Sequence, residues 1–341
     1  MHTAPAPTAL SPGESTTRSW WAWVRTLGGV GIIAVLLWRL GTGPFLDGVR
    51  LVDGWAFTAA LGIGVLTTVC SAWRWSLVAR GLGVRLPLRI AVAHCYRSVF
   101  LNATLPGGVL GDVHRAVGHG RDVGDVSRAV RAVVWERSAG QVVQLGIAIV
   151  VLFAFPSPVR SYLPAATAVV VVAGLGAVLL ARALPGSRPA RWARALRTAG
   201  SDIRDGLLAR RSWPGVVLAS TVVVLGYLAT FLVAARTAGS TAPLSQLVPL
   251  TLLALLAMSV PANVGGFGPR EGVAAWAFGA AGLTATQGVT TAVVYGALVL
   301  VSSLPGAVVL LAGRIRVPAA VRLPAAVRIP AAVRQEGALS G

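Results

Sequence analysis

Two segments of the chain combine proline, paired glycines and arginine in a pattern that suits the binding of phosphate. The first reads NATLPGGVLGDVHR over residues 102–115, and the second reads PANVGGFGPREG over residues 261–272. Proline and glycine interrupt a helix, and the first turn of the helix that resumes offers free backbone N–H groups to an anion. Arg115 and Arg270 follow these two breaks, and a guanidinium group binds phosphate through paired hydrogen bonds. Each segment therefore predicts one side of an anion site.

The ends of the two resumed helices carry further signals. We expect Asp112 to cap the helix after the first break and Pro269 to lie in the first turn of the helix after the second. An alternative interpretation is that the glycines only allow close helix packing and that the arginines extend towards the membrane surface. Two matching broken segments, one in each half of the chain, favour the binding site over this alternative.

A third polar stretch, WERSAGQVVQ, occupies residues 135–144 inside a long apolar run. Glu136, Gly140 and Gln144 are four residues apart and share one helix face, with Arg137 on the adjacent strip. A polar stripe inside a membrane span faces the interior of the helix bundle. The alternative is that Glu136 and Arg137 lie at the membrane surface and contact water.

The predicted site residues share one role, which is to contact the charged headgroup of a lipid. They are Arg97, Asn102, Gly107, Gly108, Asp112, Arg115, Glu136, Arg137, Asn263, Gly265, Gly266, Arg270 and Glu271. The arginines would bind phosphate, and the carboxylates would orient the arginines or meet a cationic part of the headgroup. No nucleophile elbow, zinc-binding spacing or phosphate-loop motif occurs. We therefore predict no catalytic residue, no metal and no cofactor.

The composition requires these segments to lie in a membrane protein. Of the 341 residues 55% are hydrophobic and only 12% are charged, whereas soluble domains carry about a quarter charged residues. Charge-free runs such as 216–233 and 289–312 have about the 20 residues that a helical span needs. The net charge of +19 comes from arginines that lie between the apolar runs, as membrane topology requires. This excludes nucleic acid as a partner and favours membrane lipids, either an anionic phospholipid or a lipid-linked intermediate.

The expected fold is all-α, a polytopic membrane helix bundle with two broken or re-entrant helical segments. The expected spans and shorter helices are 27–40, 55–75, 90–105, 130–155, 162–184, 213–235, 247–260, 270–281 and 287–311. We divide the chain into a disordered N-terminus at 1–19, a transmembrane domain at 20–315 and a basic Pro/Ala-rich disordered tail at 316–341. Within the domain, residues 188–211 predict an amphipathic cytoplasmic helix, with a solvated linker as the alternative.

The distribution of arginine predicts the orientation. Arginine is concentrated in the N-terminus, in alternate loops and in the tail, which places both termini in the cytoplasm. The first break is then entered from the cytoplasm and the second from outside, so the two halves predict an inverted repeat of the kind found in transporters. All thirty basic residues are arginine, which is typical of a GC-rich bacterial genome, and the expected location is the bacterial plasma membrane.

The two broken segments and the Glu136-Arg137 pair, in this order, resemble the lysylphosphatidylglycerol synthase transmembrane, or flippase-like, family over residues 25–315. The resemblance implies movement of a phospholipid or lipid-linked headgroup between leaflets, by a transporter and not by an enzyme. We expect this chain to lack the aminoacyltransferase domain that the best-known members carry. An alternative function is a membrane subunit or enzyme that acts on lipid-linked sugars with a partner domain in trans. No oligomeric state is predicted.

Overall fold

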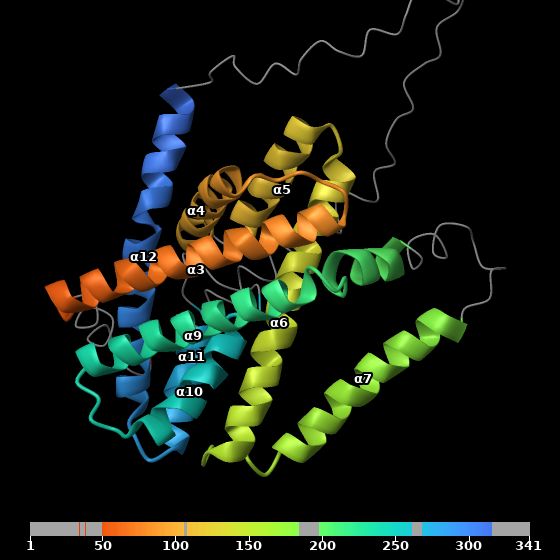
Figure 1. Ribbon diagram of the computed structural model, residues 1–341. Coiled ribbons are helices and arrows are strands. Elements are labelled where there is room, and N and C mark those ends of the chain that lie inside the picture. The colour runs from red at the N-terminus through yellow and green to blue at the C-terminus, as the bar shows by residue number, and fades with distance from the viewer. Residues whose placement is uncertain are drawn as a thin grey trace, which may run out of the picture.

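The computed structural model describes residues 34, 38, 50–105, 108–183, 198–260 and 268–315. Within these residues the chain is helical and contains no strand (Figure 1). The elements are α3 (Gly54–Gly81), α4 (Leu88–Thr104), α5 (Leu110–Val123), α6 (Val126–Ala154), α7 (Leu163–Ala183), the π-helical turn η1 (Ile203–Leu207), α9 (Trp213–Thr237), α10 (Leu244–Ala257), α11 (Pro269–Ala280) and α12 (Ala285–Ile315). The expected all-α architecture is confirmed.

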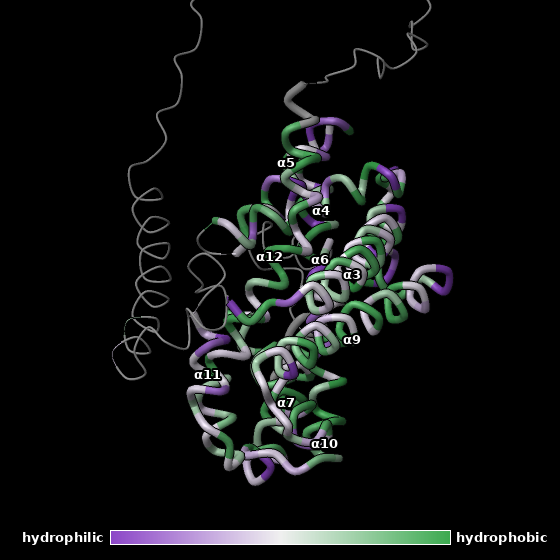
Figure 2. Tube along the Cα trace, turned by 90° about the vertical axis from the view of Figure 1, so that its left-hand side faces the viewer, coloured by the Kyte–Doolittle hydropathy of each residue, from purple (hydrophilic) through white to green (hydrophobic). Residues whose placement is uncertain are grey.

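Four of these helices, α3, α6, α9 and α12, are long and apolar enough to cross a membrane. Local signals fix where they begin and end: the Asp53 side chain accepts the N–H of Ala56 at the start of α3, and Asp125 accepts that of Arg128 at the start of α6. Pro156 follows the end of α6. Hydrophobic residues predominate along α9 and α10, and hydrophilic residues lie mainly at helix ends and loops (Figure 2). The chain is therefore a multi-pass membrane protein.

The antiparallel pair α3 and α9 packs together along its length. Gly215 of α9 lies against Leu77 of α3, and Gly226 lies against Thr67. A Cβ atom on Gly226 would be 2.3 Å from the Thr67 side chain, so the glycine lets the two helices approach closely. α12 crosses this pair and also packs against α4 and α11, while α6 contacts α5, α9 and α10.

Close backbone contact also holds α4 between two other helices. A Cβ atom on Gly111 of α5 would be 2.1 Å from the Ser98 carbonyl oxygen of α4, and one on Gly306 of α12 would be 2.2 Å from the Tyr96 carbonyl oxygen. No side chain larger than hydrogen fits at either crossing. The two contacts fix the place of the first broken segment relative to α12.

The two helix starts after the breaks differ from each other. Pro269 is the first residue of α11, as predicted. The cap of α5 is Val109 with no side-chain hydrogen bond, so the prediction that Asp112 caps this helix is wrong. Asp112 is the third residue of α5, and its carboxylate is used for ion pairs. Gly108 precedes the helix with a positive φ of 60°, which glycine adopts without strain.

Other predictions change or lie outside the described residues. α3 continues to Gly81, so Arg74 belongs to a buried helix and not to a basic loop. The stretch 115–131, most of which lies between the expected helices 90–105 and 130–155, forms most of α5 and the start of α6. Of the predicted amphipathic helix, residues 198–211 are described, including η1. The first span at 27–40, apart from residues 34 and 38, lies outside the described part, as do both termini and the site residues Gly107, Asn263, Gly265 and Gly266.

Candidate functional site

A buried carboxylate on α6 joins two arginines from different helices. Glu136 Oε1 accepts the Nε of Arg74 on α3 at 2.8 Å, and Glu136 Oε2 accepts an Nη of Arg115 on α5 at 2.6 Å. All three side chains are 5% exposed or less. The Nη1 of Arg74 donates to the Ser220 hydroxyl of α9 at 3.0 Å. Residues from α3, α5 and α6 therefore meet at one carboxylate, and α9 joins them through Arg74.

Asp112 extends the network by one further arginine. Its Oδ1 accepts the Nε of Arg115 at 2.9 Å and an Nη of Arg137 at 2.8 Å, and it also accepts the Ser98 hydroxyl at 3.0 Å. Burial raises the pKa of the Asp112 carboxyl, but the guanidinium groups of Arg137 and Arg115 outweigh this and hold the pKa well below its usual range. The carboxylate is therefore ionised.

Asn102 ties the two sides of the first break together. Its side-chain oxygen accepts the backbone N–H of Gly111 at 2.8 Å, and its amide nitrogen donates to Asp112 Oδ2 at 3.3 Å. These hydrogen bonds can form because Gly111 packs against the backbone of Ser98, which brings the start of α5 close to the end of α4. The predicted residues Asn102, Asp112 and Arg115 thus form one unit.

The network carries more positive than negative charge. It contains three arginines (74, 115 and 137) and two carboxylates (112 and 136), which leaves one positive charge in excess. The Arg137 side chain is 43% exposed, in contrast to the other two arginines. Part of this side chain is therefore exposed, while its Nε is buried and has no hydrogen-bond partner among the described residues.

The second broken segment begins beside the same face of α6. Gln141 lies one helical turn after Arg137, and its side-chain oxygen accepts the Ser259 hydroxyl at 2.6 Å. Ser259 follows α10 and precedes the second break. This contact places Ser259, which precedes the second broken segment, beside α6 at one helical turn from Arg137.

The second segment has its own buried ion pair. Arg270 pairs with the neighbouring Glu271, whose other oxygen accepts the N–H of Gly268 at 2.6 Å. Arg270 lies over the ring of Tyr295 on α12, 5.0 Å from its centroid, and is 3% exposed. The arginines after both breaks are paired with carboxylates, as predicted from the cost of a bare charge in a membrane. That Arg115 and Arg270 face one cavity stays a prediction.

An aromatic side chain covers the other side of Arg115. The guanidinium carbon lies 4.7 Å from the centre of the fully buried Trp75 ring, a distance that gives cation–π attraction. His119 and His94 meet the same ring edge-on, and both histidines are buried. Arg97, in contrast, donates to the Val309 carbonyl of α12 at 3.3 Å and not to the network.

Three residues that complete the site were not predicted from the sequence. Arg74, Trp75 and Ser220 were not singled out, because Arg74 and Trp75 were placed at the end of a span and Ser220 lies in an otherwise apolar one. One signal was available: no proline or glycine interrupts the chain between Arg74 and Gly81. Continuing the helix to Gly81 would have placed Arg74 two turns inside it.

These features define a multi-pass helical membrane protein with a buried network of arginines and carboxylates. Residues 23–306 match the family described as "Lysylphosphatidylglycerol synthase TM region". The match covers well over half of the chain, so the protein belongs to this family. No curated protein and no solved structure matches the chain.

Proposed function

We propose that the protein moves a phospholipid or lipid-linked headgroup between membrane leaflets, and that the network around Glu136 and Asp112 binds the phosphate. The observation that carries the proposal is the excess of one positive charge in the network, together with the buried Nε of Arg137, which has no hydrogen-bond partner among the described residues. A charge within a membrane is costly unless it is paired. A lipid phosphodiester, which bears one negative charge, would neutralise the network. Movement of the bound lipid to the other leaflet is the second part of the proposal, and it goes beyond the family match, which gives a membrane domain.

The helix order supports a transport mechanism with two related halves. α3 and α9, α5 and α11, and α6 and α12 begin 159 residues apart in each case, at 54 and 213, 110 and 269, and 126 and 285. The helix contacts repeat as well. In this correspondence α4 matches α10 and α12 matches α6, and α4 packs against α12 while α10 packs against α6. We infer that the halves form an internal repeat, with the broken segments α4–α5 and α10–α11 as counterparts. Such repeats are common in transporters.

A flip assay in proteoliposomes tests the function. Phosphatidylglycerol with a fluorescent acyl chain would be reconstituted with the protein, and dithionite would bleach the outer leaflet. The wild type is expected to make the inner-leaflet lipid accessible. Arg137→Ala should slow this by about tenfold or more, because a charged hydrogen-bonded contact is worth about 1.5–3 kcal/mol, and Arg137→Lys should retain part of the rate.

The matched control is Arg204→Ala. Arg204 is 78% exposed and pairs with its neighbour Asp205, so its loss should leave the flip rate unchanged. Equal rates for wild type and protein-free vesicles with every phospholipid tried would contradict the transport function. Normal transport by Arg137→Ala would contradict the network as the phosphate site.

A further inference from the structure

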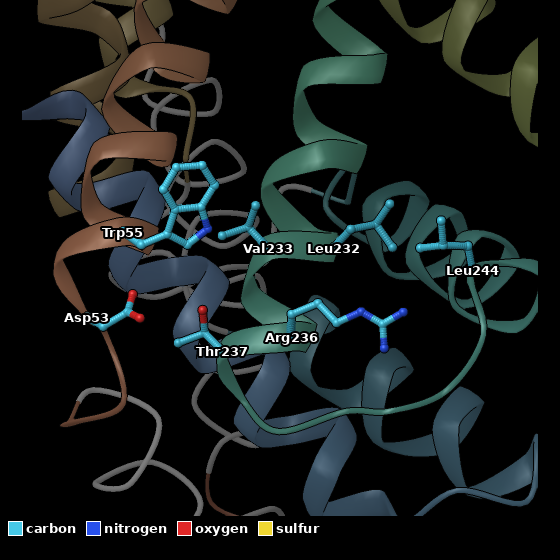
Figure 3. Close-up of a pocket in the computed structure, with 7 residues that line it drawn as sticks. All are labelled: Asp53, Trp55, Leu232, Val233, Arg236, Thr237 and Leu244. Atoms are coloured by element: carbon cyan, nitrogen blue, oxygen red, sulfur yellow. The ribbon is translucent and has the colours of Figure 1, made fainter.

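A cavity of about 380 Å³ lies between the start of α3 and the end of α9 (Figure 3), at the opposite end of this helix pair from the Glu136 network. Its walls are Asp53, Trp55, Leu232, Val233, Arg236, Thr237 and Leu244. The volume falls in the range of sites that hold a small ligand or headgroup. Along α9, Arg236 is 16 residues from Ser220, the residue that contacts Arg74, which is about 24 Å of helix. The cavity is therefore separate from the network.

The two ends of the α3–α9 pair differ in what covers them. At the end of α3, η1 packs so closely that a Cβ atom on Gly81 would be 2.6 Å from the Asp205 carbonyl oxygen. Gly206 lies against Leu82 at the same place. At the start of α3, no such segment among the described residues fills the space between Trp55 and Arg236.

Opposite charges line this cavity without pairing with each other. Asp53 Oδ1 accepts the N–H of Ala56, while its Oδ2 has no partner among the described residues. Arg236 donates one Nη to the Ser240 carbonyl at 2.7 Å, and its other donors have no partner among those residues. Figure 3 shows the guanidinium extending away from the carboxylate, so the two charges lie on different walls. The cavity can therefore hold a molecule with both a negative and a positive group.

The remaining walls are those of a lipid site. Trp55 is 73% exposed at the start of a membrane-spanning helix, where indole rings contact headgroups and glycerol. Leu232, Val233 and Leu244 provide apolar surface beside it. A soluble zwitterion would leave this apolar surface uncovered, whereas the glycerol and upper acyl chain of a lipid would cover it.

We propose that the cavity binds the headgroup of a zwitterionic phospholipid, with its phosphate on Arg236 and its primary ammonium group on Asp53. The site goes beyond the proposed function, because it is a second lipid site on this chain and its occupancy is measured at equilibrium without any transport. A quaternary ammonium group cannot donate a hydrogen bond to Asp53, so phosphatidylcholine is a poorer ligand than phosphatidylethanolamine. Phosphatidylglycerol has no ammonium group and is also poorer.

Native mass spectrometry of the full chain in detergent tests the site by titration with each of the three phospholipids. The wild type is expected to bind phosphatidylethanolamine about fivefold or more tightly than the other two, since a charged hydrogen bond at a partly exposed site contributes at the lower end of its range. Equal affinity for the three lipids in the wild type would overturn the proposal, and this comparison needs no variant.

Two variants locate the site. Asp53→Asn keeps a residue that caps a helix well but removes the charge, and it should abolish the preference for phosphatidylethanolamine over phosphatidylglycerol. Arg236→Gln should weaken the binding of all three lipids by similar factors, because all carry the phosphate. The matched control changes the exposed pair at the other end of α3, Arg204→Gln with Asp205→Asn, and should alter no affinity.

The outcomes separate a lipid from its free headgroup. Glycerophosphoethanolamine, which has the charges but no acyl chains, should fail to displace the lipid at concentrations that saturate the lipid site. Displacement at equal concentration, or wild-type affinities for all three lipids in both Asp53→Asn and Arg236→Gln, would overturn the proposal. Loss of flipping with lipid binding intact would count against the transport function and leave this site standing.

Discussion

At the scale of single residues, the central fact is that one buried carboxylate serves two arginines. Glu136 is 1% exposed and faces Arg74 and Arg115 from different helices. A buried ion pair contributes little net stability when it forms, but the removal of one partner leaves a charge that is buried and unpaired. The network therefore holds the bundle in a specific arrangement more than it increases its stability.

Replacing this carboxylate by a neutral isostere should be severely destabilising. Glu136→Gln leaves two guanidinium groups without their shared counter-charge, and the expected loss is about 3–5 kcal/mol, read as a lower midpoint of thermal unfolding in detergent. Asp205→Asn, in an exposed ion pair, should change the midpoint very little.

A double-mutant cycle checks the cause of this loss. Because Arg74→Gln removes one of the two uncompensated charges, Arg74→Gln with Glu136→Gln should be less destabilised than the sum of the single variants. Additive losses would show that Arg74 and Glu136 act independently and would contradict the network as one unit.

At the scale of elements, the positions of most helices could be predicted and the contacts between them could not. Apolar runs and prolines predicted α4, α6, α9 and α12 to within a few residues of their observed bounds, because span length and helix termination are local properties. The end of α3 was placed too early, since an arginine after an apolar run is usually at the membrane surface. Only the tertiary contact with Glu136 makes a buried Arg74 acceptable.

The site was predictable to the same extent. Asp112, Arg115, Glu136 and Arg137 were singled out by residue type and spacing, and all four lie in one network. The role of Asp112 as a cap was wrong, because two arginines compete for its carboxylate and the sequence does not show how close α6 lies. Tertiary contacts decide between a local and a distant partner for the same side chain.

The glycine at the start of α5 provides a test of the contact between elements. Gly111→Ala would place a Cβ atom 2.1 Å from the Ser98 carbonyl oxygen, and since the contact is with backbone, α4 and α5 must separate. We expect a loss of several kcal/mol in thermal unfolding or a failure to fold, together with slower flipping. Gly146→Ala on α6, where nothing lies within 4 Å, should be neutral or slightly stabilising.

At the scale of the whole molecule, the distribution of arginine predicts the orientation of the spans. Arg204, Arg210 and Arg211 precede α9, whereas Arg236 alone lies in its last turn. In a background with Cys70 and Cys95 replaced, Thr241→Cys should therefore react with an impermeant thiol reagent in intact cells, and Ser212→Cys should not. The reverse pattern of labelling would invert the topology.

The two glycine contacts of α4 have a mechanical consequence. Gly111 and Gly306 meet the backbone of this helix at Ser98 and Tyr96, only two residues apart, and no side chain lies between the backbones to be repacked. A rearrangement of α5 relative to α12 would then be a rotation about a pivot on α4. Displacements would be smallest at this crossing and would grow towards the far ends of α12 and α5, which act as lever arms of unequal length.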